Sequence, residues 1–408
     1  MKTYTLPNGI KIVHQYMPGV AVSHCGLILK FGSRNEKENE HGIAHLIEHC
    51  LFKGTEKRKA YHILSRLDAV GGELNAYTTK EELCVYASFI NQYYERAIEL
   101  ICDITFHSTF LDKEIDKEKE VITDEIHSYA DNPSETLFED FETILYPNHA
   151  LGRTILGTEK SVKKFSRIDI QRFLKRMMDT SQIVFSSVGN IPHDKFEKLI
   201  QKYLAVIPMI SSNEKLNTVS KLNQDNVELQ KDLVQAHCIM GLPSYPLKDE
   251  KRKVLVLLAN ILGGSGMNNR LNLNIREKYG YTYSIESNYQ SFIDTGNFNI
   301  YFSSETKHFD KIMKLIKKEL NILKSKEIGA TQLSLAKKQL KGHIAIGHDN
   351  NANLMLSIGK SMLYFDEVES IEGVYDKIDS ISAETLLEVA DEMLDIDKFS
   401  SLSFMPKK

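Results

Sequence analysis

The sequence has no long hydrophobic run and no excess of basic residues, and each absence excludes a class of partner. No apolar stretch approaches the ~20 residues of a membrane-spanning helix, and the first nine residues lack the apolar region of a secretory signal. The formal net charge of −4 gives no reason to expect nucleic acid or an anionic membrane as a partner. We therefore expect a cytoplasmic protein of bacterial type, with no nucleic-acid partner and no membrane partner.

Cysteines are also few, and their arrangement argues against disulfides. The five cysteines are an odd number, none has Cys-x-x-Cys spacing, and all have apolar neighbours: Cys25, Cys50, Cys84, Cys102 and Cys238. This pattern is typical of reduced thiols in a protein core. Cys50 directly follows His49, but the two side chains would point about 100° apart on a helix. We therefore expect Cys50 in the core and not as a metal ligand.

The chain is long enough for two domains, and the order of its predicted elements supports that number. Its 408 residues, 42% hydrophobic and 26% charged, have the composition of an ordinary globular protein. Residues 208–226 are poor in large apolar side chains, so we interpret them as an exposed linker. The order of strands and helices in residues 1–207 recurs in residues 227–408. We predict an α+β fold of two similar domains, each an antiparallel β-sheet with helices packed on it.

Hydrophobic periodicity and turn residues predict the individual elements. Asn8-Gly9 predicts a β-hairpin within residues 3–16. Further strands are predicted at residues 20–32, 74–79, 83–90, 182–188, 236–241, 281–290 and 296–304. Helices are predicted at residues 41–52, 60–70, 93–106, 113–129, 134–146, 166–178, 193–203, 253–262, 270–278 and 308–325.

The predicted helix at residues 41–52 carries a pattern that is typical of zinc sites. Its apolar residues would face a core, whereas His45, Glu48 and His49 fall on the other side. His45 and His49 are one turn apart and about 40° apart around the axis, so both imidazoles could bind one zinc ion. Glu48 would project beside them as a base for a water molecule. An amphipathic helix with two surface histidines would show the same pattern, so the hypothesis needs a third ligand.

Glu125 is the candidate for that third ligand. With Glu118 and two branched aliphatic residues, it forms a stripe on one face of the predicted helix 113–129. A face that buries aliphatic side chains would also bury the carboxylates, which is costly unless each is paired or bound to a metal. The alternative is an acidic, solvated face. His127 is a rival ligand, but it would point about 200° away from Glu125.

These residues resemble the signature of the pitrilysin-type inverzincin zinc metallopeptidases, in particular the small subclass that includes processing peptidases. The inverted motif stands here as His45-Leu-Ile-Glu48-His49, and Glu125 matches the distal glutamate of the family. The resemblance implies His45, His49 and Glu125 as ligands of one Zn²⁺ per chain, with Glu48 as the general base. It also implies that Glu118 orients a ligand.

Two further segments resemble the substrate-binding parts of the same family. Residues 71–81 resemble its edge strand, which binds an extended peptide by strand addition and would bring Asn75 and Ala76 to the substrate. Residues 273–284 resemble its arginine–tyrosine segment, which implies that Arg276 and Tyr283 bind substrate carbonyl groups.

The resemblance implies a zinc endopeptidase that hydrolyses peptides or unfolded precursor segments inside a chamber formed by paired two-domain chains. Because this chain carries both the metal motif and the arginine–tyrosine pair, we expect a homodimer. One alternative is a catalytically silent, peptide-binding subunit of a peptidase complex. Another is a nucleotide-binding enzyme built on Gly263–Gly266, but this turn lacks the Lys-Ser/Thr of a phosphate loop.

Overall fold

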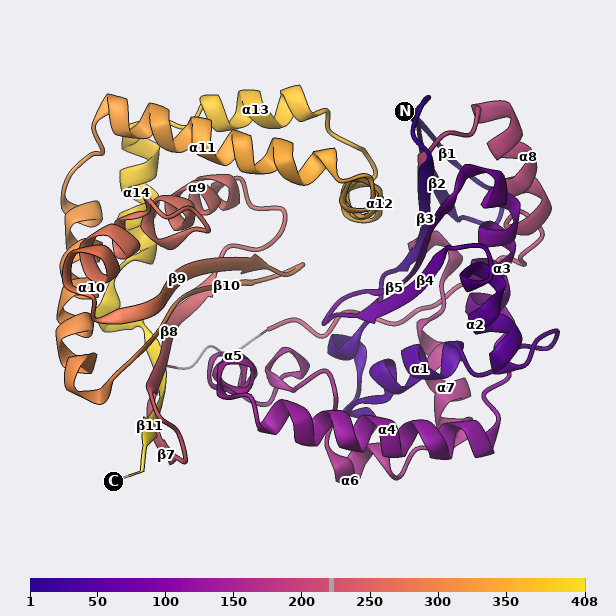
Figure 1. Ribbon diagram of the computed structural model, residues 1–408, viewed down its shortest axis with the longest axis horizontal. Helices are drawn as coiled ribbons and strands as arrows, with labels where there is room; N and C mark the ends of the chain where they lie inside the picture. The colour runs from indigo at the N-terminus through magenta and orange to yellow at the C-terminus, as the bar shows by residue number, and fades with distance from the viewer. Residues whose placement is uncertain (220–223, 408) are drawn as a thin grey trace. The chain divides into compact units, whose positions relative to one another are not determined.

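The computed structural model describes residues 1–219 and 224–407, which divide into two compact units (Figure 1). The first unit comprises Met1–Ser128, Arg153–Asn217 and Ala345–Glu369, and the second comprises Tyr129–Gly152, Thr218–Ile344 and Ser370–Lys408. Each unit contains one β-sheet covered by helices. The predicted α+β fold with two sheet-and-helix domains is therefore confirmed.

The first unit is built on a six-stranded sheet in the order β1-β2-β6-β3-β5-β4. Its strands are β1 (Lys2–Thr5), β2 (Lys11–Tyr16), β3 (Val22–Leu29), β4 (Glu73–Thr78), β5 (Leu83–Ile90) and β6 (Ile183–Gly189). The hairpin predicted from Asn8-Gly9 joins β1 to β2, with Gly9 at a φ of +94°. The sheet is not purely antiparallel as predicted, since β2 and β6 run parallel. A parallel neighbour is possible here because β6 follows a long helical crossover and not a hairpin.

The helices of the first unit share one apolar core with this sheet. They include α1 (Ile43–Leu51), α2 (Ala60–Asp68), α3 (Tyr94–Phe106), α4 (Asp112–Ala130), α6 (Glu159–Val162), α7 (Arg167–Met177) and α8 (His193–Tyr203). Leu27 and Phe185 of the sheet and Ile98 of α3 are fully buried in this core. The apolar residues of α1 belong to it as well, so the core fixes one side of the helix that carries the zinc motif.

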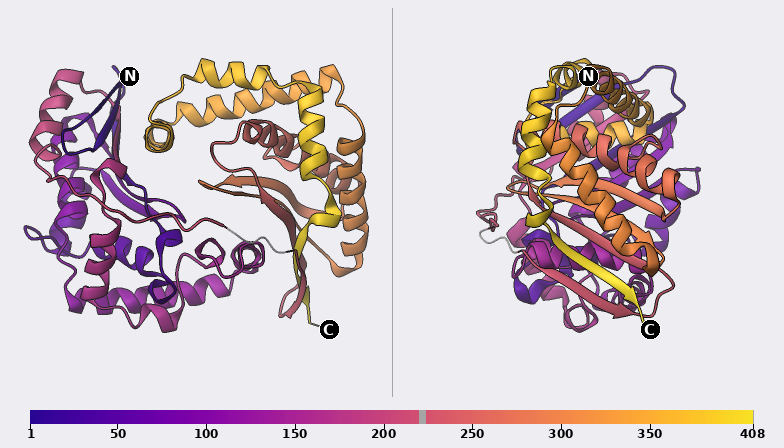
Figure 2. Two further views of the ribbon diagram at one scale, coloured as in Figure 1. Left: turned by 180° about the vertical axis from the view of Figure 1, so that it is seen from behind. Right: turned by 90° about the vertical axis from the view of Figure 1, so that its left-hand side faces the viewer.

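The second unit repeats this design with a five-stranded sheet in the order β7-β11-β8-β10-β9. Its strands are β7 (Asn226–Lys231), β8 (Ala236–Ser244), β9 (Thr282–Ser291), β10 (Gly296–Ser304) and β11 (Ser400–Pro406). Here too one pair, β7 and β11, is parallel. The helices include α5 (Pro133–Leu145), α9 (Lys251–Gly263), α10 (Phe309–Ser325), α11 (Ala330–Asp349), α13 (Ile371–Asp379) and α14 (Ala383–Met393). In this unit α10 and α14 lie side by side (Figure 2).

Two helices belong to a different unit from the one that their position in the sequence suggests. Helix α5 packs on β8 and β11 of the second sheet, where its residue Phe141 is fully buried. Helix α12 (Asn351–Phe365) packs on β2, β3 and β6 of the first sheet. Gly359 permits this close approach, because a Cβ there would lie 2.5 Å from Ile28 Cδ1. The units therefore differ from the predicted domains 1–207 and 227–408. The reason is that α5 and α12 each bury an apolar face against a sheet whose strands come from the other half of the chain.

Other predictions have mixed outcomes. The predicted linker 208–226 includes residues 220–223, which lie outside the described residues, while residues 208–219 contain no helix or strand. All five cysteines are buried free thiols, as predicted, and Cys50 is 1% exposed in the first core. Within the described ranges, no helix combines the length and the apolar character needed to cross a bilayer.

His14 of β2 is a fully buried ionisable group in the first unit. Its Nε2 lies 2.9 Å from the carbonyl oxygen of Ile191, and its ring stacks on Phe196 with the centroids 4.0 Å apart. Burial lowers the pKa of His14 to about 4, although the hydrogen bond to Ile191 opposes this shift. The unfolded chain therefore binds a proton at His14 more readily than the folded chain does.

We expect the free energy of unfolding to decrease as the pH falls from 6.5 to about 4, since only unfolded His14 gains a proton in this range. At ~1.4 kcal/mol per pKa unit, the contribution of His14 is about 3 kcal/mol. His14→Phe keeps the stacked ring but removes the titrating nitrogens, so its unfolding free energy should decrease less steeply in urea titrations at several pH values. His62→Phe, at an exposed position, is the control. Parallel pH profiles for wild type and His14→Phe would contradict the prediction.

Candidate metal centre and active site

Helix α1 carries both histidines of the motif. It spans Ile43–Leu51 and is shorter than predicted, because Gly42 precedes it in a left-handed conformation and Phe52 ends it. His45 and His49 lie on the same side of this helix, with ring centroids 4.6 Å apart. The one-turn spacing that the sequence predicted is therefore present in the structure.

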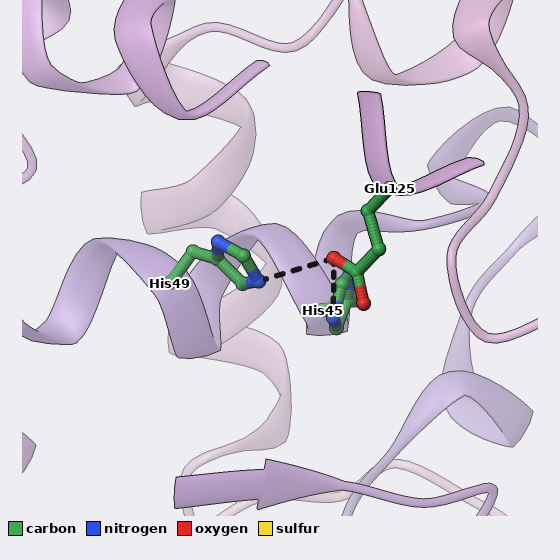
Figure 3. Close-up of side chains that lie close together, drawn as sticks. All are labelled: His45, His49 and Glu125. Atoms are coloured by element: carbon green, nitrogen blue, oxygen red, sulfur yellow. Dashed lines mark ion pairs between the residues drawn. The ribbon is translucent and has the colours of Figure 1, made fainter. Parts of the chain in front are cut away.

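Helix α4 brings Glu125 to these two imidazoles (Figure 3). Glu125 Oε2 lies 3.8 Å from His45 Nε2 and 3.6 Å from His49 Nε2. Potential ligand atoms of the three residues all lie within 4.8 Å of one another, and the described residues contain no second group of this kind. The rival ligand His127 has a side chain that is 63% exposed and faces Glu159 instead.

The spacing of these three side chains fits a zinc ion. Separations of 3.6 and 3.8 Å are too long for hydrogen bonds. They are close to the ~3.3 Å that separates two ligands of a tetrahedral zinc with bonds of ~2.0–2.1 Å. Two imidazole nitrogens and one carboxylate oxygen are also a donor set that zinc accepts, and they leave one coordination position for water or substrate.

The protonation of His45 also suits a ligand. The residue is 7% exposed, and its buried Nδ1 has no hydrogen-bond partner in the described part of the chain. Burial, together with the charge of His49, lowers the pKa of His45 to about 3. The imidazole is therefore neutral near pH 7, which is the form that binds a metal ion.

Glu118 holds His49 from the side opposite to Glu125. Its Oε2 lies 3.2 Å from His49 Nδ1, and its Oε1 lies 2.8 Å from Lys53 Nζ. Burial alone would raise the pKa of Glu118, but the hydrogen bonds from His49 and Lys53 outweigh it and the net pKa is lowered. With Nδ1 engaged by Glu118, His49 presents Nε2 to Glu125.

The stripe predicted from the sequence is only partly buried. Glu118 is 5% exposed and Ile122 is fully buried. Val121, in contrast, is 48% exposed, and the Glu125 side chain is 35% exposed. The prediction that this face buries both aliphatic residues is therefore wrong for Val121, which lies on the solvent side of α4.

Lys53 is the residue of this group that sequence reasoning missed. It lies two residues beyond the last residue of α1, where a basic side chain is ordinary at a helix C-terminus. Its partner Glu118 is 65 residues away in the chain and meets it only because α4 crosses α1. No local pattern in the sequence indicates that contact.

Glu48 lies beside the ligands on α1 and contacts Thr78 at the end of β4. Burial raises the pKa of Glu48. A half-buried carboxyl group next to two metal-ligand candidates can accept a proton from water and return it to a leaving group.

Strand β4, which contains Asn75 and Ala76, is an edge strand that lies against α1. Asn75 is exposed, whereas Ala76 packs partly against the core. Among the described residues no strand pairs with the outer edge of β4, whose backbone groups could therefore pair with an extended peptide.

Arg276 and Tyr283 lie together in the second unit. Arg276 belongs to a π-helical turn, Asn272–Glu277, within the predicted helix 270–278, and Tyr283 belongs to the edge strand β9. The guanidinium carbon of Arg276 lies 5.2 Å from the centroid of the Tyr283 ring, and Tyr283 is 80% exposed. The structure thus brings together the two residues that the sequence singled out in this half.

Comparison with known sequences decides the family. The profile described as insulinase (peptidase family M16) matches residues 11–159, and that of the peptidase M16 inactive domain matches residues 164–340. The chain belongs to peptidase family M16. The uncharacterized zinc protease YmxG of Bacillus subtilis is 30% identical, over 97% of this chain and 96% of that protein. An uncharacterized zinc protease of Streptomyces coelicolor is 31% identical, over 96% of this chain and 86% of its own length.

Solved structures show the same fold over the whole chain. A peptidase M16 inactive domain from Pseudomonas fluorescens has a TM-score of 0.91 at 18% identity, covering 100% of this chain and 98% of that one. A protease from Helicobacter pylori has a TM-score of 0.89 at 20% identity, covering 99% of both chains. The resemblance to the small, two-domain type of this family is therefore confirmed.

Glu118→Gln should weaken zinc binding by roughly 10–100-fold. Glutamine has one oxygen where glutamate has two, and the NH₂ group that replaces the other oxygen cannot accept a hydrogen bond from His49 or Lys53. Competition with a chelator would measure the dissociation constant. Glu114→Gln is the matched control, since Glu114 lies one turn earlier on α4 and pairs with Lys117 at 3.1 Å. Equal zinc affinities for the two variants would show that Glu118 does not orient the ligand.

Proposed function

We propose that this M16 chain is a zinc-dependent endopeptidase that hydrolyses peptides or unfolded precursor segments. The observation that carries the proposal is the convergence of His45, His49 and Glu125 from two helices, with Glu48 beside them. All four residues lie in residues 11–159, the segment that matches the insulinase profile and not the inactive-domain profile. The names of the relatives as zinc proteases support the same conclusion.

In the proposed mechanism His45, His49 and Glu125 hold one zinc ion. When bound, the ion supplies Lewis acidity toward a water molecule and toward the carbonyl group of the scissile peptide bond. Glu48 accepts a proton from the attacking water and donates it to the nitrogen of the leaving amine. Glu118 keeps the His49 ring in the orientation that this arrangement needs.

Substrate binding is proposed to use strand addition. An extended peptide would pair with the free edge of β4, beside Asn75 and Ala76, and would run along the strand that contacts α1. Arg276 and Tyr283 would donate hydrogen bonds to carbonyl groups of the substrate. Strand pairing recognises the backbone and requires an extended chain, which favours short or unfolded substrates over folded proteins.

Glu48→Gln should retain zinc but lose at least ~10²-fold in peptide cleavage, because the amide cannot accept the proton of water. Metal analysis of the purified variant and mass spectrometry of the products from a peptide library would measure both properties. Glu56→Gln, at an exposed position just beyond α1, is the matched control. Normal cleavage by Glu48→Gln would overturn the assignment of the base, and a wild type that binds zinc but cleaves no peptide would favour a silent subunit.

We further propose that two copies of the chain pair to enclose the substrate in a chamber. The proposal is supported by the presence of both the metal residues and the Arg276/Tyr283 pair in one chain, so that no second type of subunit is needed. Sedimentation equilibrium should give the mass of a homodimer, and activity should follow the dimer fraction on dilution. A stable monomer with full activity would contradict this proposal. The cytoplasmic location stays a prediction, as does the absence of nucleic-acid and membrane partners.

A further inference from the structure

The first turn of α1 has backbone N–H groups that its own cap residue cannot satisfy. The first four N–H groups of a helix have no partner within the helix, and the side chain of the N-cap residue usually accepts from one of them. The N-cap of α1 is Gly42, which has no side chain. Its φ of +94° also lies in the region that favours glycine.

A side chain at position 42 is excluded by packing as well. A Cβ on Gly42 would lie 2.8 Å from both Gly157 Cα and the carbonyl oxygen of Leu156. His41 Nε2 lies 2.9 Å from the carbonyl oxygen of Thr154 in the same loop. The loop at residues 154–157 thus closes directly on the start of α1, and any cap has to come from another part of the chain.

Glu36 provides that cap from six residues upstream. Its Oε2 accepts a hydrogen bond from the N–H of Gly42 at 2.9 Å, and its Oε1 accepts one from the N–H of Ala44 at 2.9 Å. Glu36 is 4% exposed, so these bonds form away from water, where an unsatisfied N–H costs most. Arg153 Nη2 donates to the backbone oxygen of Glu36 at 2.5 Å and fixes the segment that carries the carboxyl group.

The cap can form in either protonation state of Glu36, and it is stronger when the carboxyl group is ionised. Burial raises the pKa of this carboxyl group to about 8, while the N–H groups of Ala44 and Gly42 oppose the shift. Each oxygen retains a lone pair for its N–H donor in either protonation state.

We propose that Glu36 is a positioning residue for the metal centre, because its two oxygens fix where α1 begins and how its first turn is oriented. His45 directly follows Ala44, whose N–H is held by Glu36. A shift of this turn would move His45 Nε2 relative to Glu125, while His49 would stay with Glu118 at the other end of the helix. Metal ligands have to be held within ~0.5 Å of their productive positions, so even a small shift weakens binding. This inference rests on the proposed zinc site.

The test compares zinc binding by Glu36→Gln and Glu40→Gln. In Glu36→Gln an NH₂ group replaces one oxygen and faces a backbone N–H donor, so one bond to the first turn of α1 is lost. Glu40 is the matched control from the same segment, since it is 8% exposed, accepts from the N–H of Lys37 at 2.9 Å and pairs with Arg176. None of these contacts of Glu40 involves α1. Both variants therefore lose a buried carboxylate oxygen, but only one of them loses a bond to the helix.

We expect the dissociation constant for zinc to increase roughly 10–100-fold in Glu36→Gln and to stay within about twofold of wild type in Glu40→Gln. It is measured by chelator competition, at a temperature where the unfolding curves of the metal-free proteins show that each is fully folded. A purely structural role would lower the unfolding temperature without changing the zinc affinity of the folded protein. Equal zinc affinities for the two variants would overturn the inference.

Two further outcomes keep the test decisive. If Glu36→Gln does not fold, Glu36→Asp takes its place, because it keeps both oxygens but shortens their reach by one methylene group. Its zinc affinity should then be lower than that of wild type, and an unchanged affinity would overturn the inference. If the wild-type protein fails to bind zinc, the proposed function itself is overturned. If wild type and Glu36→Gln bind zinc equally well, only the positioning role of Glu36 is overturned.

Discussion

The contact of Glu118 with His49 and Lys53 is the interaction on which the rest of the metal centre depends. A buried carboxyl group is costly unless it is paired, and both partners of Glu118 lie at the end of α1 or just beyond it. The pairing therefore fixes the register of α4 against α1. Shifting α4 by one residue would move it by ~1.5 Å along its axis and turn it by ~100°, which would remove Glu125 from both imidazoles. Glu118 and Glu125, seven residues apart on α4, thus act together. Glu118 fixes the position of the helix, and Glu125 faces the proposed metal position.

Helix α1 is constrained at both ends and along one side. Glu36 bonds to its first turn, Glu118 and Lys53 hold its last turn, and its apolar face packs in the first core. These constraints are independent of any ion. Together they hold the rings of His45 and His49 with their centroids 4.6 Å apart.

The sequence predicts those parts of the site that depend on local geometry. The spacing of His45 and His49 fixes their common face once the segment is helical, and Asn8-Gly9 fixes a hairpin, because both depend on a few neighbouring residues. Glu125 could be found from the stripe on its helix and from the family resemblance. Lys53 and Glu36 could not be assigned, because their roles depend on how α4 and the segment before Gly42 meet α1. Sequence spacing contains no information about such crossings.

The same limit explains the two helices that differ from the predicted domains. The apolar periodicity of α5 and α12 predicts an amphipathic helix, but it does not say which sheet the apolar face covers. In α12 that face meets β2, β3 and β6, and Gly359 allows its backbone to approach Ile28. Residues 1–207 contain every metal-ligand candidate, yet without α12 they would expose this apolar surface to water. The helix that completes the first unit, which carries the proposed metal site, therefore comes from residues 351–365, so the first half of the sequence is not a complete folding unit on its own.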